Sequence, residues 1–300
     1  MKNQQTIKRG AVWTAPVGLA GLASRILAGA VALLLISGAF SAAWAITGGE
    51  PDGNLHPNVG AVIVYDPLLG VVPYFSGTLV HERVFLTAGH GVAPILDGEV
   101  LLLGVSFDAE VDLEDTSTWL PVERVECSYR HNPTNSGADS NHIDIAVLVL
   151  KDPVESVAPA TLPTAGFLDV LKQAGELEAG PGGTEFTVVG YGWGLDWPPP
   201  QDIYPISADG KALRNAAQTG YRGLDESWLI ASQNLAAGYG GVNKGDSGGP
   251  AFCTDPFTGD EILVAITTWG GSPVGNSFYY RIDTVESLNF IQDVIDSLEK

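Results

Sequence analysis

Residues 245–250 read Gly-Asp-Ser-Gly-Gly-Pro, and no other part of the sequence is as informative. As a fixed string, this hexapeptide arises by chance in a chain of this length on the order of once in 10⁵ times. Glycines allow a sharp backbone turn, so that neighbouring amides can point at one spot beside the Ser247 hydroxyl. Each such N–H group stabilises an oxyanion by about 3 kcal/mol. The stretch therefore predicts a nucleophilic serine in an oxyanion-binding turn, in preference to a glycine-rich turn with an incidental serine.

A serine hydroxyl is a poor nucleophile unless a base takes its proton, and one histidine is well placed to act as that base. The chain contains five histidines: His56, His81, His90, His131 and His142. His90 ends Phe-Leu-Thr-Ala-Gly-His at residues 85–90, an apolar strand followed by a turn of small residues. A lone histidine is more often structural, but an imidazole at a strand end above a cleft suits a general base.

Asp144 is the candidate partner of His90. It directly precedes Ile-Ala-Val-Leu-Val-Leu at residues 145–150, a run expected to form a buried strand. An unpaired carboxylate at the mouth of such a strand is costly. Paired with a histidine, it fixes the tautomer of the ring and stabilises its charged form.

The order histidine, aspartate, serine, together with the sequence around each of them, resembles that of the trypsin/chymotrypsin family of serine proteases. The resemblance covers nearly all of the chain after residue 45. It begins with Ile-Thr-Gly-Gly at residues 46–49, which is similar to the activated N-terminus of the family. Further matches lie at residues 75–80, 190–192, 268–270 and 279–282 and in the C-terminal segment.

The resemblance implies an all-β fold of two antiparallel six-stranded β-barrels, chymotrypsin-like, with a C-terminal α-helix. The composition agrees, because 37 glycines and 19 prolines separate many short apolar runs. The expected divisions are a signal peptide at 1–45, a first barrel at 46–165 with His90 and Asp144, a second barrel at 166–283 with Ser247, and a helix at 284–300.

Apolar runs between turn residues predict the strands, and one segment predicts a helix. Strands are expected at 59–65, 74–80, 84–87, 100–103, 119–126, 145–150, 185–189, 262–268 and 277–282. Residues 151–183 should connect the barrels, and Pro-Pro-Pro at 198–200 should lie in an exposed loop. Helical spacing is found only at 284–298, where five apolar residues should dock on the core: Val285, Leu288, Ile291, Ile295 and Leu298.

The resemblance also assigns roles to the site residues. Ser247 would attack a peptide carbonyl while His90 takes its proton and Asp144 steadies the imidazolium. The N–H groups of Gly245 and Ser247 would hold the oxyanion, and Thr268, which replaces the usual serine, keeps a hydroxyl for Asp144. This acyl transfer needs no cofactor and no metal. Activity should rise with pH as His90 loses its proton near neutrality.

The first 45 residues read as an export signal, with basic residues, an apolar stretch at 26–40 and Ala-Trp-Ala at 43–45. Cleavage after Ala45 would free the amino group of Ile46. In the family this group pairs with the aspartate before the nucleophile, here Asp246, and orders the oxyanion hole. The mature protein would be secreted or periplasmic and free of the membrane. An uncleaved anchor at 26–46 is the alternative, because that length can span a bilayer.

The expected specificity pocket carries no charge. In the family, a preference for basic residues comes from an aspartate six residues before the nucleophile, and that position is Gly241 here, followed by Val242. A buried Lys or Arg would find no counter-charge, at a cost of several kcal/mol. An apolar or aromatic residue before the scissile bond is therefore expected, although the alignment around residues 272–276 is open. The other expected substrate-binding residues are Thr268, Trp269, Gly270 and Ser277.

The charge of the chain excludes some partners. The formal net charge is −20, and without the leader 11 basic and 35 acidic residues remain, a charge of −24. Such a field repels nucleic acid and anionic membranes. We expect a soluble monomer that acts on polypeptides, with attraction of basic substrates as the weaker alternative.

Two features depart from the family or stay open. The family's cysteine beside the catalytic histidine is replaced by Gly91, and its partner position is Ser76. Cys127 and Cys253 are the two cysteines, and sequence alone leaves a bond between them open. Some family members bind calcium in the loop at residues 105–119, but we favour a solvated acidic loop; its acidic residues are Asp108, Glu110, Asp112, Glu114 and Asp115.

Two rival functions are compatible with this reading. A non-catalytic homologue could use the fold as a binding or adhesion module, although all three site residues are present. An esterase is the second rival, because a fold does not fix the substrate class.

Overall fold

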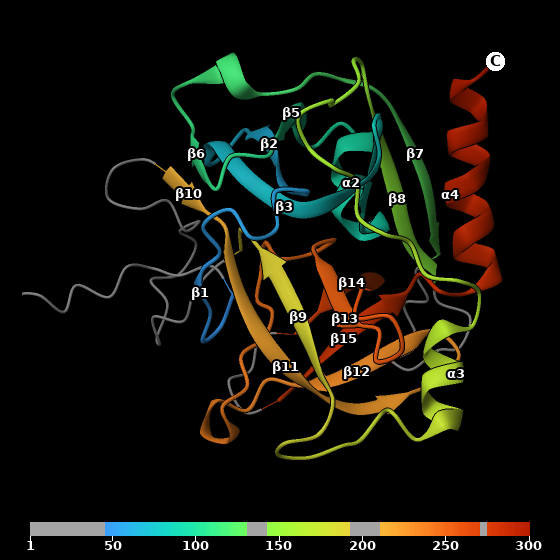
Figure 1. Cartoon of the computed structure of the whole chain (residues 1–300). Coiled ribbons are helices and arrows are strands. Elements are labelled where there is room, and N and C mark those ends of the chain that lie inside the picture. The colour runs from blue at the N-terminus through green and yellow to red at the C-terminus, as the bar shows by residue number, and fades with distance from the viewer. Residues whose placement is uncertain (1–45, 131–142, 193–210, 271–274) are drawn as a thin grey trace, which may run out of the picture. The chain divides into compact units, whose positions relative to one another are not determined.

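The computed structural model describes residues 46–130, 143–192, 211–270 and 275–300, which form two large β-sheets and one small two-stranded sheet (Figure 1). The expected leader at 1–45, the proline run at 198–200, and the histidines His131 and His142 lie outside these residues.

The second half of the chain forms a closed antiparallel barrel of six strands. The ring runs β11-β12-β15-β14-β13-β9, and β9 pairs again with β11. A short strand from the N-terminal segment, β1 (Glu50–Pro51), adds to β11. The bounds in the ring are Glu185–Gly190 (β9), Asn215–Leu224 (β11), Trp228–Ser232 (β12), Pro250–Thr254 (β13), Glu261–Trp269 (β14) and Asn276–Arg281 (β15).

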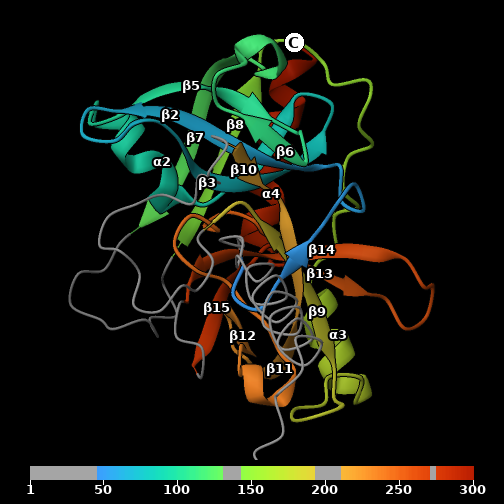
Figure 2. The ribbon, with the colours of Figure 1, turned by 90° about the vertical axis from the view of Figure 1, so that its left-hand side faces the viewer.

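The first half forms a curled sheet of six antiparallel strands in the order β5-β2-β3-β4-β8-β7 (Figure 2). Near its two edges, Val105 and Leu120 exchange backbone hydrogen bonds of 3.0 and 2.7 Å, which almost close the sheet. The bounds are Val59–Asp66 (β2), Gly70–His81 (β3), Val84–Thr87 (β4), Leu101–Ser106 (β5), Val122–Arg130 (β7) and Ile143–Leu150 (β8). A closed barrel, a curled sheet and a C-terminal helix confirm the expected chymotrypsin-like fold.

Strand β8 shows why the predicted core strand forms. It pairs with β4 on one side and β7 on the other, and all eight of its residues are buried. Its sequence is therefore apolar without alternation, as is typical of a strand with no solvent-facing side. Asp144 is the single charged residue in it, which makes a partner for this carboxylate obligatory.

The prediction that only the C-terminal segment is helical is wrong. Helix α2 (Gly89–Leu96) contains Pro94, and α3 (Phe167–Ala174) lies in the segment expected to connect the barrels. Each helix has eight residues, too few for a sustained helical period in the sequence. Strands β11 to β13 are also missing from the prediction. Small and polar residues hide the alternation of β11, and β12 and β13 have only five residues each. The acidic loop contains strand β6 (Glu110–Asp112), which pairs with β10 (Lys211–Leu213).

Helix α4 (Val285–Leu298) forms as expected, and four of the five residues expected to dock on the core are buried or partly buried. Thr284 caps it, because its hydroxyl accepts a hydrogen bond from the Ser287 N–H at 3.2 Å. Val285 is 63% exposed, since it lies in the first turn, outside the buried face. That face consists of Ser287, Ile291 and Val294, with Leu288, Ile295 and Leu298 partly buried.

The helix follows the second barrel in sequence but lies beside β7 and β8 of the first sheet (Figure 1). Both β1 and α4 therefore pack on the sheet from which they are remote in sequence. The division into 46–165, 166–283 and 284–300 stays a prediction.

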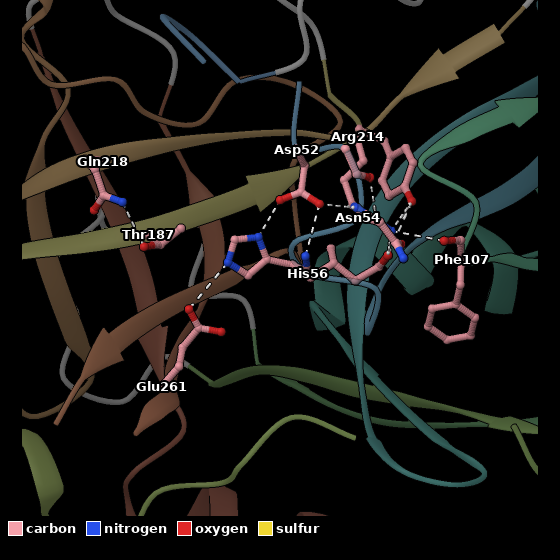
Figure 3. Close-up of polar contacts among 11 residues, drawn as sticks. Asp52, Asn54, His56, Phe107, Thr187, Arg214, Gln218 and Glu261 are labelled. Carbon is pink, nitrogen blue, oxygen red and sulfur yellow. Dashed lines mark hydrogen bonds and ion pairs between the residues drawn. The ribbon is translucent and has the colours of Figure 1, made fainter. Parts of the chain in front are cut away.

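A buried ion pair holds the N-terminal segment against both sheets (Figure 3). The guanidinium of Arg214, just before β11, donates to the Asp52 carboxylate at 2.8 Å. It also donates to the carbonyls of Val59 and Phe107 at 3.0 Å each. Both charged side chains are fully buried. Removing one partner of such a pair costs about 3–5 kcal/mol, because the other charge is left uncompensated.

His56 extends this network toward the surface. Its Nδ1 contacts the Asp52 carboxylate, and its Nε2 lies 3.4 Å from a carboxylate oxygen of Glu261 (Figure 3). The ring also stacks on Phe252, with centroids 5.5 Å apart. Burial favours the neutral ring, but the hydrogen bonds to Asp52 and Glu261 outweigh it and raise the pKa of His56 to about 9. At neutral pH, His56 therefore carries a positive charge and links the carboxylate of Asp52 to that of Glu261 in β14.

This network predicts a loss of stability at alkaline pH. The pKa of His56 rises from an ordinary 6.5 to about 9 on folding, so its contribution is complete below pH 6.5 and is lost as the pH passes through 9. We expect the free energy of unfolding to fall by on the order of 3 kcal/mol between pH 7 and 10, measured by denaturant titration. In His56→Gln this decline should largely disappear.

His81→Gln is the matched control, because His81 has no contact with this network, and it should keep the wild-type decline. An equal decline in His56→Gln and the wild type would show that other groups cause it.

Candidate active site

His90 stands where the first sheet gives way to helix α2. Strand β4 ends at Thr87, and His90 is the second residue of the helix. Gly89 allows this approach, since a Cβ there would lie 2.9 Å from the Cβ of Tyr129 and 3.3 Å from Oδ1 of Asp144. The small residues between strand and helix thus bring the His90 backbone and ring to the mouth of β8.

The three residues predicted as a catalytic triad are brought together. His90 Nδ1 lies 2.9 Å from Oδ2 of Asp144, and His90 Nε2 lies 2.9 Å from the Ser247 hydroxyl. The His90 backbone N–H donates to Oδ1 of the same carboxylate at 2.7 Å. With a proton on Nδ1, the ring donates to Asp144 and accepts from the serine hydroxyl.

Burial is graded across these residues. Asp144 is fully buried, the His90 side chain is 31% exposed, and Ser247 is of intermediate exposure. Burial by itself disfavours both charges, but mutual attraction raises the pKa of His90 and lowers that of Asp144. The carboxylate therefore stays ionised when the ring is neutral, and the hydroxyl can be reached from outside.

The Thr268 hydroxyl lies near Asp144, as the sequence leads one to expect. It helps to lower the pKa of Asp144, yet it is buried without a partner that meets hydrogen-bond geometry. The two N–H donors of His90 are thus the hydrogen-bonding groups that hold the carboxylate.

The turn at 245–249 is built as the glycine-rich sequence predicts. Gly245 and Gly248 have φ angles of +92° and +79°, which residues with a side chain rarely adopt. The N–H of Asp246 donates to the carbonyl of Asn243 at 3.1 Å and closes the turn. In the part of the chain that the structure describes, no hydrogen bond uses the N–H groups of Gly245 or Ser247. These are the two donors predicted for the oxyanion.

The Asp246 side chain points into the protein and organises the segments around the turn. It accepts from the N–H of Gly192 at 2.7 Å, from that of Asn243 at 2.8 Å and from the backbone of Ile46. Burial outweighs these hydrogen bonds and raises the pKa of Asp246 to about 7. Ile46, which the sequence pairs with this aspartate, is itself fully buried.

Most of the predicted substrate-binding residues also cluster. A Cβ built on Gly270 would lie 2.8 Å from Cγ2 of Val242 and 3.1 Å from the Ser277 hydroxyl. A Cβ on Gly241 would lie 2.3 Å from the Cβ of Gln233. Trp269 is 42% exposed and stacks on Phe278, with ring centroids 3.8 Å apart.

Sequence reasoning missed Gln233 and Ser76. Gln233 is fully buried beneath Gly241, and its side-chain carbonyl accepts from Ser277. No pattern marks it, because it follows a strand that the sequence did not predict. Ser76 was noted only as a replaced cysteine, and its contacts with the turn could not be foreseen.

The described residues also give findings on the cysteines, on metal ligands and on membrane-spanning helices. Cys127 and Cys253 are both free. Among the described residues, no three His, Cys, Asp or Glu side chains are grouped as metal ligands. Within the same residues, no helix is both long and apolar enough to cross a bilayer.

Comparisons with known proteins agree with this geometry. The family model described as Trypsin matches residues 67–289, which include all three residues of the predicted triad. Thrombin-like enzyme gloshedobin from Gloydius shedaoensis is 28% identical over 236 residues, 74% of this chain and 77% of that protein.

Snake venom serine protease Haly-2 from Gloydius brevicauda is 27% identical over 282 residues, 90% of this chain and 95% of that protein. Serine protease 56 from Homo sapiens is 30% identical over 233 residues, 71% of this chain and 34% of that protein. The chain therefore belongs to the trypsin family of serine proteases.

Proposed function

We propose that this protein is a secreted serine endopeptidase that hydrolyses peptide bonds through an acyl-enzyme, with Ser247, His90 and Asp144 as its catalytic residues. The observation that carries the proposal is the pair of 2.9 Å contacts that join the serine hydroxyl to the imidazole and the imidazole to a buried carboxylate. Membership of the trypsin family supports the hydrolase activity.

In the proposed mechanism, the Ser247 oxygen attacks the peptide carbonyl while Nε2 of His90 takes its proton. The N–H groups of Gly245 and Ser247 stabilise the oxygen that becomes negative, and Asp144 stabilises the imidazolium. His90 then gives its proton to the leaving amine. A water molecule, deprotonated by the same ring, hydrolyses the acyl-enzyme. Because the pKa of His90 is raised, this base needs a pH above its ordinary value of 6.5 to be neutral.

The nucleophile can be tested by covalent labelling. We expect a fluorophosphonate to add one adduct to the wild-type chain and none to Ser247→Ala, as measured by intact mass. Peptide hydrolysis should fall by on the order of 10⁶ in the variant, since an intact triad acts as a unit. Ser128→Ala, a change in strand β7, is the control and should label as the wild type does.

The outcome of this experiment separates the rival functions. No adduct on a folded chain would reject the enzyme and favour the binding or adhesion module. An adduct with turnover of esters but not of peptides would favour the esterase.

We propose further that signal peptidase activates the enzyme directly by cutting after Ala45. The support is the buried position of Ile46, whose backbone N–H meets Asp246, a carboxylate that among the described residues is bonded by backbone N–H groups and by no cation. A freed amino group there would add the missing positive charge. That charge would keep Asp246 ionised and the turn ordered.

This activation predicts that the chain must begin at residue 46. One extra residue before Ile46 should lower kcat/KM by about 10²–10³, the effect of losing an oxyanion donor. Ile46→Val, which shortens the side chain but keeps the free amine, is the control and should stay active. Full activity of the extended chain would reject this route.

We propose that the substrate residue before the scissile bond is apolar and small. No charged side chain lies among Gly241, Val242, Gly270 and Ser277, and Val242 is only 1% exposed. Its side chain and the buried Gln233 occupy space that a large residue would need. Alanine and valine fit this description better than the aromatic residues that the sequence also allowed.

The specificity is measurable with matched peptide substrates. We expect kcat/KM for alanine or valine before the scissile bond to exceed that for lysine at least about 100-fold, because a buried lysine lacks a counter-charge. Val242→Ala should raise the ratio of kcat/KM for phenylalanine to kcat/KM for alanine about tenfold, the usual effect of one methylene group of space in a pocket. Val264→Ala, in the core of the same barrel, should leave the ratio unchanged. Equal cleavage after lysine and alanine would contradict the proposal.

We infer the localisation and the partners of the protein from its leader sequence, its relatives and its net charge. The leader sequence supports export to the periplasm or the exterior, and one of the relatives reported above, Haly-2, is named as a snake venom protein. The negative charge supports a monomer that acts on polypeptides and binds neither nucleic acid nor anionic membranes.

A further inference from the structure

Ser76 lies in strand β3 of the first sheet, but its N–H and its hydroxyl both bond the turn of the second sheet that carries Ser247. Its N–H donates to the carbonyl of Ser247 at 2.9 Å, and its hydroxyl donates to the carbonyl of Gly245 at 3.1 Å. Its own carbonyl accepts from the Thr87 hydroxyl at 2.7 Å. Ser76 is fully buried, so these contacts exclude water.

The direction of the Ser76 hydroxyl is fixed by a third group. Its oxygen accepts a hydrogen bond from the N–H of Tyr191 at 3.0 Å, so its proton is directed to the Gly245 carbonyl. Tyr191 is anchored in turn, because its hydroxyl donates to the carbonyl of Asp108 at 2.7 Å and accepts from Arg214 at 3.3 Å. The relay therefore begins at the buried ion pair of Figure 3 and ends at the turn.

The turn needs such a restraint at Gly245. This glycine has a φ of +92°, and without a side chain its peptide planes rotate more easily than those of other residues. The Ser76 hydroxyl holds the peptide plane after Gly245, and the bond from Asp246 N–H to Asn243 holds the turn as a whole. The Gly245 N–H lies in the preceding peptide plane, which shares the Gly245 Cα with this one, so a shift of Gly245 that moved its N–H away would strain both contacts.

We propose that Ser76 is a positioning residue for the oxyanion hole: its hydroxyl, oriented by the Tyr191 N–H, holds the Gly245 carbonyl so that the Gly245 N–H faces the developing oxyanion. This role rests on the proposed function. Ser76 acts through Gly245 and touches no substrate. Its effect belongs to the transition state, so it should appear in kcat and leave KM unchanged.

The test compares two buried serines of the first sheet. Ser76→Ala should lower kcat for a peptide amide about tenfold, the worth of one neutral hydrogen bond, with KM within about twofold of the wild type. Ser106→Ala is the matched control, because Ser106 is also fully buried, and its hydroxyl bonds the carboxylate and the N–H of Asp108, not the Asp108 carbonyl that holds Tyr191. It should keep the wild-type kcat. The unfolding temperature of each variant is measured alongside.

Ser76→Cys provides a second readout, since a thiol of similar size is a weaker hydrogen-bond donor. Its kcat should lie between those of the wild type and Ser76→Ala, and it keeps the proposal testable if Ser76→Ala does not fold. Reductant can be present throughout, because both native cysteines are free.

The role would be overturned by a wild-type kcat in Ser76→Ala or Ser76→Cys, by a loss confined to KM, or by an equal loss in Ser106→Ala. A wild-type chain that neither cleaves peptides nor takes the fluorophosphonate would overturn the proposed function, and this role with it.

Discussion

Asp144 has no exposed surface, and an ionised carboxylate in such a place is stable only if nearby donors replace the water it has lost. His90 supplies two of them, its backbone N–H and its ring Nδ1–H, one to each carboxylate oxygen. Because both donors belong to one residue, the carboxylate fixes the place of the backbone and the angle of the ring together. Nε2 is then left facing Ser247. The orientation of the His90 ring toward the serine thus follows from the way in which the buried Asp144 carboxylate is solvated.

The same physical problem is solved twice more in the chain, with different outcomes. Asp52 is buried against the cation of Arg214 and the ring of His56, and its pKa is lowered. Asp246 is equally buried but has backbone N–H groups as its donors, and its pKa is raised to about 7. Hydrogen bonds without a cation thus do not offset burial at Asp246. The remaining cost of burying the Asp246 charge is borne by the turn that carries Ser247. A positive charge added beside Asp246 would reduce this cost.

The sequence predicts the triad better than its surroundings. His90, Asp144 and Ser247 each lie in a local pattern with a chemical meaning, and the structure brings all three together. Core strands such as β4 and β8 are almost continuously apolar, so they are also predictable. Strand β11 is not, because its small and polar residues pack against neighbours remote in sequence, and β12 is too short to show a pattern. Gln233 follows β12, and its contact with Ser277 on β15 depends on that unforeseen pairing.

The contacts that join the two sheets at Ser76 could not be predicted from the sequence either. Where the family resemblance leads one to expect a cysteine pair, Gly91 and Ser76 stand instead. A Cβ on Gly91 would lie 3.2 Å from the ring of Phe75, so packing fills that side. Ser76 uses its polar groups on the nucleophile turn. Cys127 and Cys253 do not replace the missing bond, since both are free, and burial raises the pKa of their thiols to about 11 and 12, which keeps them protonated and unreactive. The candidate active site is therefore held by burial and hydrogen bonds, and its geometry should not depend on the redox state of its surroundings.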